Sequence, residues 1–497
     1  MKTNIFRRLL SPMLALTILV SSAVVSFTPI SAAESDQADT AAASNAEPSK
    51  NEYQIVSPVP SGSSITPITQ APRLDSLQGK RIALVGGSYD DILFTGSHER
   101  VQQFYETSEM SDGLPVVPPT RDKVEYYLQY TTYAATDIVN MKNGEIQDMP
   151  PANRKVYAYQ VAVNAIMAGC PPEYMPLCIA IVRCFANGNF YKSLASTHGW
   201  TPYVLVSGPI ARQLGFSYDK GMINEEANKL LGRFVSLAML NIAGYKIKEN
   251  RMGTFGYMLP IAFAEDEEAC LQIGWNPYHV EKSYDLNTSV VTCGSTLTWG
   301  NPVQVGTNDP EKALQLLSWD VTEKQQNGLG NTNPREARMV MLTKDAAAKI
   351  AQATGCGSKT GLKDTLIDTA RRPLWMRTYA HYWANTGSKI HLNTTFDQHY
   401  NDIRRGVSTE NVERDYVAST TVPEWLKGVV PYDKIDTTQT IEANNTGFVI
   451  TGGDQTSQFQ IMPGGDTCSF NVNLPRNWDE LVAREGYSPI GNYNLSQ

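Results

Sequence analysis

Short runs of aliphatic residues, each followed by a turn and a helix-like segment, occur at four places along the chain. They are RIALVGGSYDD from Arg81, YVLVSGPIARQLG from Tyr203, ARMVMLTKDAAAKIA from Ala337 and GFVITGGDQTS from Gly447. Continuous apolar strands of this kind suit a sheet that is covered on both faces. The pattern therefore predicts an α/β fold with a mixed or parallel sheet, buried helices and two lobes.

Three apolar segments between these strands predict helices, at residues 153–169, 173–187 and 228–245. The last two are apolar nearly all round, so we expect them to be buried. Together with the strand at Tyr203 they are expected to form a main α/β domain over residues 73–330. The polar stretch TEKQQNGLGNTNP is typical of an exposed connection, and a second α/β lobe is expected over residues 331–497.

The beginning of the chain predicts export. Residues 1–33 have a basic start, the apolar run LALTILVSSAVV and a small-residue cleavage site, which are the features of a secretory signal peptide. Residues 34–72 are rich in Ser, Ala, Thr, Asp and Pro, which predicts a disordered, solvated linker. We therefore expect a secreted or cell-envelope location, with no membrane insertion once the signal is removed.

The charge of the chain limits its partners. The formal net charge is −8, and it becomes −11 when Lys2, Arg7 and Arg8 leave with the signal segment. No cluster of Lys and Arg is visible elsewhere. Nucleic acid and anionic membranes both require such clusters, so neither is expected to be the main partner.

Several longer motifs resemble the UGSC family of selenoproteins and their cysteine homologues. APRLDSLQGKRIALVGG resembles the opening of that domain, and NAIMAGCPPEYMPLCIAIV, STHGWTPYVLVSGPIARQLGF and FAEDEEACLQIGWNPYHVEKSY resemble a larger segment that often accompanies it. The family is named for a selenocysteine- or cysteine-Gly-Ser-Cys turn. In this chain TCGST at Cys293 and GCGSK at Cys356 lack the second cysteine, so a thiol-redox activity is not carried over from the resemblance.

Seven cysteines are present, an odd number that leaves at least one thiol without an intramolecular partner in an oxidising compartment. Cys170 follows a helix end and stands just before PPE, which begins the next helix. The positive end of a helix lowers the pKa of a nearby thiol. Cys170 is therefore a candidate nucleophile or redox thiol, and the alternative is a turn cysteine that packs or pairs with another. Cys178 and Cys184 lie inside an apolar helix and are expected in the core.

Histidines and carboxylates supply a second set of candidates. His198 lies in ASTHGWTPYVLVSGP, just before the clearest strand, where loops of α/β proteins carry active-site groups. It is a candidate acid or base for Cys170. His279 follows the acidic run FAEDEEAC. Together with Glu265 or Glu268, His198 and His279 could bind a divalent metal ion through two imidazoles and one carboxylate, although no HExxH-type spacing is present.

Other segments offer weaker candidates. SDGLPVVPPT contains Asp112, which could act as an acid or base on a pocket wall or belong to a structural strap between the lobes. Glu173, in the segment CPPEYMP after Cys170, is the last catalytic candidate. Backbone N–H groups in VSGPIARQLG and ITGGDQT could bind a carboxylate or phosphate, but neither segment matches a nucleotide-binding motif. Three further histidines fit no common ligand spacing: His381, His391 and His399.

Three functional hypotheses follow, all with a small-molecule ligand or substrate. The first is a secreted enzyme with Cys170 as nucleophile and His198 as its acid or base in a pocket between the lobes, whose reaction is that of a lyase, a hydrolase or a thiol transferase. The second is a metal-dependent enzyme that uses His198, His279 and a glutamate. The third is an extracellular protein that binds a ligand without chemistry.

Overall fold

The computed structural model describes a defined part of the chain. The described residues are 52–58, 89–189, 191–323, 338–373, 395, 397–398, 416–417, 437–439, 446–464 and 467–493. All of them fall within residues 48–497, one of the two compact units into which the chain divides. The predicted signal peptide, the strand predicted at Arg81 and the three histidines at 381, 391 and 399 lie outside the described residues.

A four-stranded mixed sheet forms the first layer, in the order β15-β7-β5-β6. Its strands are β5 (Thr201–Ser207), β6 (Ile261–Ala264), β7 (Val290–Thr296) and β15 (Cys468–Asn471). β5 is parallel to β6 and antiparallel to β7, and every residue of β5 and β7 is buried. The uninterrupted apolar run at Tyr203 therefore forms a strand covered on both faces, as an α/β fold requires.

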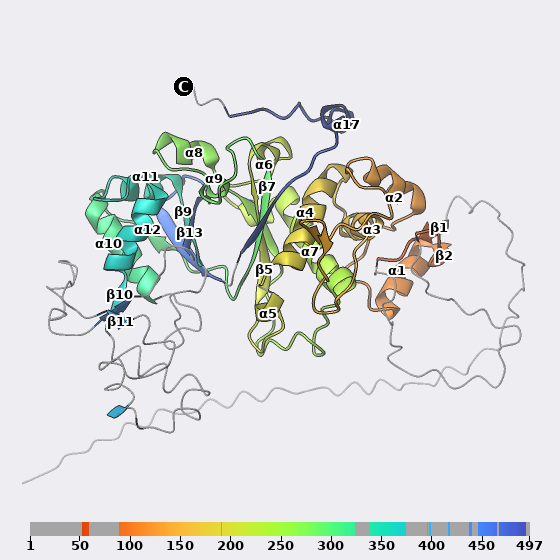
Figure 1. Cartoon of the computed structure of the whole chain (residues 1–497), viewed down its shortest axis with the longest axis horizontal. Helices are drawn as coiled ribbons and strands as arrows, with labels where there is room; N and C mark the ends of the chain where they lie inside the picture. Colours follow the sequence, from red (N-terminus) through yellow and green to blue (C-terminus); the bar gives the residue numbers. More distant parts are fainter. Residues whose placement is uncertain are drawn as a thin grey trace, which may run out of the picture. The chain divides into compact units, whose positions relative to one another are not determined.

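Three helices lie beside this sheet (Figure 1): the second and third contact its strands, and the first packs on those two helices. They are α3 (Ala158–Ala168), α4 (Met175–Asn187) and α7 (Glu226–Leu237). All residues of α3 are buried, which explains its nearly uninterrupted apolar sequence. The helix ends where Gly169 takes a φ of +82°, a left-handed conformation that glycine adopts without steric cost. α4 contacts β7 and β15, and α7 contacts β6.

A second four-stranded sheet has the order β13-β9-β14-β8. Its strands are β8 (Val303–Gln304), β9 (Arg338–Leu342), β13 (Thr446–Ile450) and β14 (Gln458–Pro463). β9 and β13 are parallel, and β14 is antiparallel to β9. The helices that share a hydrophobic core with this sheet are α10 (Pro310–Glu323), α11 (Lys344–Ala351) and α12 (Lys359–Thr369). Helices and mixed sheets together confirm the predicted α/β class.

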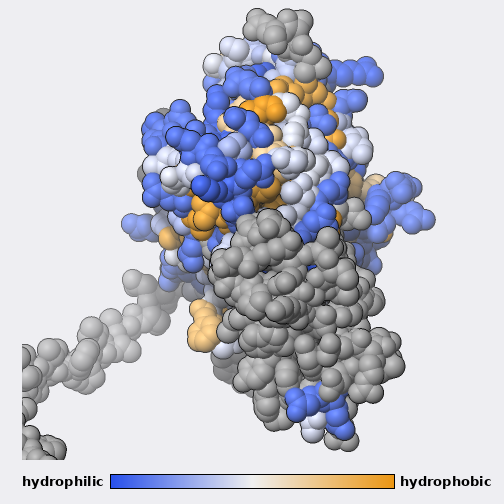
Figure 2. Space-filling view, turned by 90° about the vertical axis from the view of Figure 1, so that its left-hand side faces the viewer, coloured by the Kyte–Doolittle hydropathy of each residue, from blue (hydrophilic) through white to orange (hydrophobic). Residues whose placement is uncertain are grey.

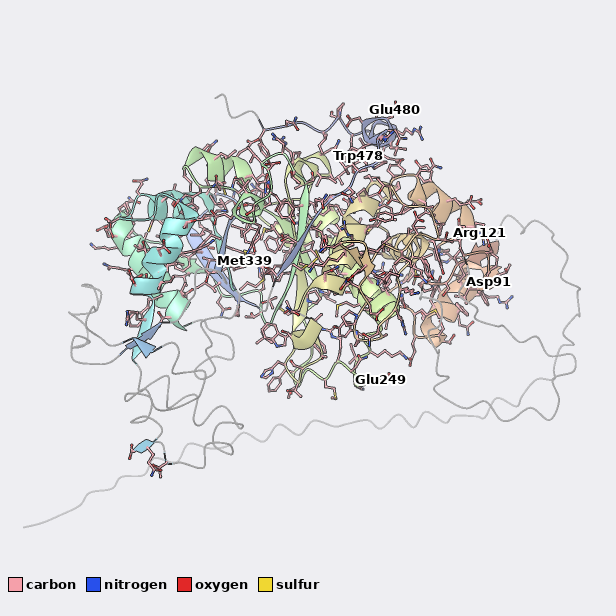
Figure 3. All side chains as sticks on the ribbon, in the orientation of Figure 1. Asp91, Arg121, Glu249, Met339, Trp478 and Glu480 are labelled. Carbon is pink, nitrogen blue, oxygen red and sulfur yellow. The ribbon has the colours of Figure 1, made fainter. Side chains whose placement is uncertain are left out.

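The two sheets contact each other directly. Tyr203, Leu205 and Phe263 of the first sheet form one buried cluster with Met339 and Met341 of β9. Met339 is labelled in Figure 3, where it lies between the two sheets. β15 follows the second sheet in the chain but joins the first, while β8 precedes residue 330 but joins the second. Each sheet therefore takes strands from both sides of that position.

The remaining elements are short. The other helices are α1 (His98–Thr107), α2 (Arg121–Leu128), α5 (Tyr191–Leu194), α6 (Pro209–Gln213), α8 (Glu267–Gln272), α9 (Tyr278–Glu281) and α17 (Trp478–Arg484). Two 3-10 turns, η1 (Pro172–Tyr174) and η2 (Met222–Asn224), precede α4 and α7, and a π-helical segment, η3 (Ala238–Ala243), follows α7. Small sheets pair β3 (Met141–Lys142) with β4 (Glu145–Ile146), and β10 (Arg371–Pro373) and β11 (Tyr416–Val417) with β12 (Thr437–Gln439). Among the described helices, none has the length and apolar character needed to cross a membrane.

Residues 52–58 lie within the segment predicted to be a solvated linker, yet the structure describes them as ordered. β1 (Glu52–Ile55) pairs antiparallel with β2 (Phe94–Ser97), and Ile55 and Val56 are fully buried. The apolar pair supplies enough buried surface to order these residues despite the polar composition around them. Elsewhere, the face of the molecule in Figure 2 shows hydrophilic residues interrupted by small hydrophobic areas.

The packing of α7 on β6 yields a test of this arrangement. Gly232 of α7 faces the entry to β6, and a Cβ there would stand 2.5 Å from the carbonyl oxygen of Pro260. We expect Gly232→Ala to lower the free energy of unfolding by about 1–3 kcal/mol because a rigid backbone atom must move. Gly306→Ala is the control, since a Cβ there meets nothing within 4 Å. Urea denaturation measures the free energy of unfolding of both variants. Equal values for the two would contradict the close packing of Gly232 on Pro260.

Candidate functional site

The carboxyl ends of parallel strands from both sheets meet at one edge. The N–H of Asp266, just after β6, donates to the carbonyl of Ile450 at the end of β13 (2.7 Å). The N–H of Thr451 donates in turn to the carbonyl of Leu342 at the end of β9 (2.8 Å). Ligands of α/β proteins bind outside the carboxyl ends of parallel strands. This edge is therefore the first place to look for a site.

Two adjoining cavities open at this edge, with volumes of about 310 and 210 Å³. Asp219 and Thr451 line both of them, so we treat the two as one site, the edge crevice. One end of the edge crevice has an apolar wall. Its side chains are Met222, Ile223, Trp299, Met341 and Phe459.

The other end of the edge crevice is acidic. Asp219, Asp266 and Asp454 line it together with one cation, Lys344. Burial raises the pKa of Asp266, while the hydrogen bond from the Ala269 N–H and the charge of Lys344 act in the opposite direction. Asp219 also pairs with Lys220 (3.8 Å), so three carboxylates stand against two cations here, and this end of the crevice keeps an excess of one negative charge.

The thiol candidate lies away from this crevice, in the core. Cys170 is completely buried, and its Sγ donates a hydrogen bond to the Leu230 carbonyl oxygen (3.3 Å). The Tyr127 hydroxyl donates to the Cys170 carbonyl oxygen (2.6 Å). His198 is exposed and lines a separate cavity with Thr254 and neighbouring residues. No described hydrogen bond joins Cys170 to His198, so the structure does not assemble the predicted nucleophile and base.

The predicted metal ligands are also separated. His198 precedes β5, whereas Glu265 follows β6, and the two strands are parallel. Seven residues of strand at about 3.3 Å each put roughly 20 Å between the two ends of the sheet. Glu268 pairs with Arg212 on the surface (3.1 Å). Within the part of the chain that is described, no three His, Cys, Asp or Glu side chains are grouped to hold a metal ion.

Asp112 is held in an ion pair, whereas Glu173 is buried in the core. Asp112 forms a two-pronged ion pair with Arg233 of α7, at 3.0 and 3.1 Å, which fastens the proline-rich segment to that helix. Glu173 is buried, and burial raises the pKa of its carboxyl, although a hydrogen bond from Tyr487 offsets part of that effect. Neither residue lines the edge crevice.

Glu265 and Glu267 both turn inward. Glu265 accepts from the buried ammonium of Lys359 (2.6 Å), from the Tyr278 N–H (2.6 Å) and from the Cys270 thiol (3.2 Å). Lys359 did not stand out in the sequence analysis, because a lysine in a short polar stretch gives no sign that it will be buried. The carboxyl-binding turn predicted in VSGPIARQLG exists, but its Gly208 N–H is taken by the chain's own Glu267 (2.6 Å).

His279 lies between two acceptors. Its Nε2 is 3.1 Å from the Leu286 carbonyl oxygen, and its Nδ1 is 3.3 Å from Glu267 Oε1, close enough for an ion pair but without the direction of a hydrogen bond. Burial lowers the pKa of His279, but Glu267, the Leu286 carbonyl and Glu265 outweigh it, so that the pKa is raised above 6.5. Folding therefore makes the protonated imidazole of His279 more favourable than it is in the unfolded chain.

Removing the Lys359 ammonium should be costly. Lys359→Met leaves the Glu265 carboxylate buried without its counter-charge, and we expect a loss of about 3–5 kcal/mol in the free energy of unfolding. The double variant Glu265→Gln/Lys359→Met should recover much of that loss. Lys363→Met on the same helix breaks the less deeply buried pair with Glu281 and should cost clearly less than Lys359→Met. Equal losses for the two single variants in urea denaturation would contradict the assignment.

The His279 contact predicts a pH-dependent stability. A pKa raised on folding stabilises the protein fully below the unfolded value of 6.5, and this contribution is lost as the pH rises through the folded value. The difference in unfolding free energy between wild type and His279→Gln should therefore shrink from pH 5.5 to pH 8.5. The exposed His198→Gln serves as the control. A difference that grows with pH would show that folding does not raise the pKa of His279.

Comparisons with known proteins do not indicate a function for this chain. No family model matches the chain, and neither the curated proteins nor the solved structures yield a match. The likeness to the UGSC family remains an expectation from its motifs. Function is therefore inferred from the geometry of the edge crevice.

Proposed function

We propose that this protein binds a small organic cation in the edge crevice. The single observation that supports this most is the pairing of an apolar wall with three carboxylates in one pair of adjoining cavities at the carboxyl edge of both sheets. The apolar part of the ligand would lie against Trp299 and Phe459, and its ammonium group would face Asp219 and Asp266. Such a division between an apolar surface and a few placed polar groups is usual in ligand sites.

Electrostatics supports a cation over an anion. At the acidic end three carboxylates exceed by one the two nearby cations, Lys344 and the Lys220 that pairs with Asp219. The chain as a whole carries a formal charge of −8. A field of one sign in a cleft concentrates ligands of the opposite sign. A bound ammonium group would also offset the burial that raises the pKa of Asp266.

Binding is a better account of this geometry than Cys–His catalysis. Cys170 is buried against Leu230 and His198 lines a different cavity, whereas the edge crevice combines space, charge and apolar surface. We also propose, from the features of residues 1–33 alone, that the protein acts outside the cytoplasm.

Three probes of similar size and different charge test the proposal: 2-phenylethylammonium, 2-phenylethanol and 3-phenylpropanoate. Only the ammonium compound should raise the unfolding temperature and give a titration by calorimetry. Asp266→Asn should weaken its binding by about tenfold or more, equivalent to about 1.4 kcal/mol. Asparagine still caps a helix, so the α8 N-cap made by Asp266 is kept.

Asp122→Asn is the matched control, because Asp122 is an exposed aspartate on α2, away from the crevice. Its affinity for the ammonium probe should equal that of the wild type. Tighter binding of 3-phenylpropanoate, or equal loss in both variants, would rule out cation binding by the acidic end.

A further inference from the structure

Three cysteines from separate parts of the chain converge where α4 packs on the first sheet. Cys184 belongs to α4, Cys293 to β7 and Cys468 to β15. Cys293 and Cys468 are directly paired across the two antiparallel strands. The Cys184 thiol donates to the Cys468 carbonyl oxygen (3.2 Å) and approaches the Val291 carbonyl oxygen (3.6 Å).

The Cys184 thiol lies beside the thiols of both Cys293 and Cys468. Cys184 and Cys293 are completely buried, whereas Cys468 is only half-buried. Cys468 is therefore the most accessible thiol of the three. Cys293 lies beside it in the same sheet, whereas Cys184 approaches it from α4, in another layer of the fold.

We infer that Cys184 and Cys468 form a redox latch, a disulfide that fastens the last strand of the first sheet to α4. With glutathione disulfide as the oxidant, the thiolate of one cysteine attacks it and displaces one glutathione. The second cysteine then attacks the mixed disulfide and displaces the other. One S–S bond forms between the cysteines, one breaks in the oxidant, and two molecules of reduced glutathione carry away the electrons and the protons.

The burial of the two thiols indicates when the disulfide forms. Burial and the neighbouring Cys293 thiol raise the pKa of Cys184, and contact with the Cys184 thiol and burial raise the pKa of Cys468, which keeps both as thiols in the folded protein. The thiolate is the reactive form, so exchange in the folded state is slow. The latch is therefore expected to close during folding, before β15 and α4 bury the two sulfurs.

The latch would stabilise the end of the chain. Cys184 and Cys468 are 284 residues apart, so their cross-link closes a long loop, for which the loss of unfolded-state entropy is large. β15 is an edge strand of its sheet, and α17 follows it, with Trp478 and Glu480 labelled in Figure 3. Without the cross-link, β15 is held by pairing with β7, by packing on α4 and by the hydrogen bond from the Tyr284 hydroxyl to the Ser469 carbonyl oxygen (3.0 Å).

Peptide mapping of the full chain tests the latch. The protein is folded in a glutathione redox buffer, denatured without reductant, alkylated and digested. Five of the seven cysteines should be alkylated, and the remaining two should appear in one cross-linked peptide pair that contains Cys184 and Cys468. The intact mass should be lower by two hydrogens than that of the reduced protein.

Two cysteine variants show whether the cross-link depends on Cys184 itself. Cys184→Ala should leave all six remaining cysteines open to alkylation, whereas Cys356→Ala, which removes a cysteine from the other core, should keep the cross-link. A Cys293–Cys468 peptide in the wild type, or alkylation of all seven cysteines after oxidative folding, would overturn the inference.

Discussion

The buried carboxylate of Glu265 is the interaction on which the arrangement of the two sheets depends. It follows β6 of the first sheet and accepts from Lys359 on α12, while the Ile450 N–H of β13 lies 3.4 Å from the same oxygen. Its other oxygen accepts from the Tyr278 N–H. A buried charge is tolerated only when such partners are all in place, so this carboxylate requires the second sheet to stand where it does.

The edge crevice is a consequence of that requirement. Because Glu265 fixes the end of β6 beside the end of β13, the next residue, Asp266, begins α8 at the mouth of the crevice and lines it. Glu267 turns inward to Gly208 and His279, and Glu268 turns outward to Arg212. Four consecutive acidic residues thus have four environments, and one of them supplies charge to the proposed ligand site.

The sequence predicted individual strands and helices better than it predicted which residues form the site. Uninterrupted apolar runs at Tyr203 and Gly447 correctly indicated strands covered on both faces, because burial on two sides leaves a direct mark on composition. The pairing of Glu265 with Lys359 left no such mark, because it joins residues 94 positions apart. Helix-end reasoning drew attention to Cys170, but the thiol is turned into the core. The acidic run was recognised, and only the fold could show which of its members face inward.

A crystal structure of the protein with 2-phenylethylammonium would test the central claim most directly. The account predicts the ammonium group between Asp219 and Asp266 and the phenyl ring against Trp299 or Phe459, with Glu265 still bound to Lys359. A probe bound instead in the cavity beside His198, or an edge crevice left empty at saturating concentration, would contradict it.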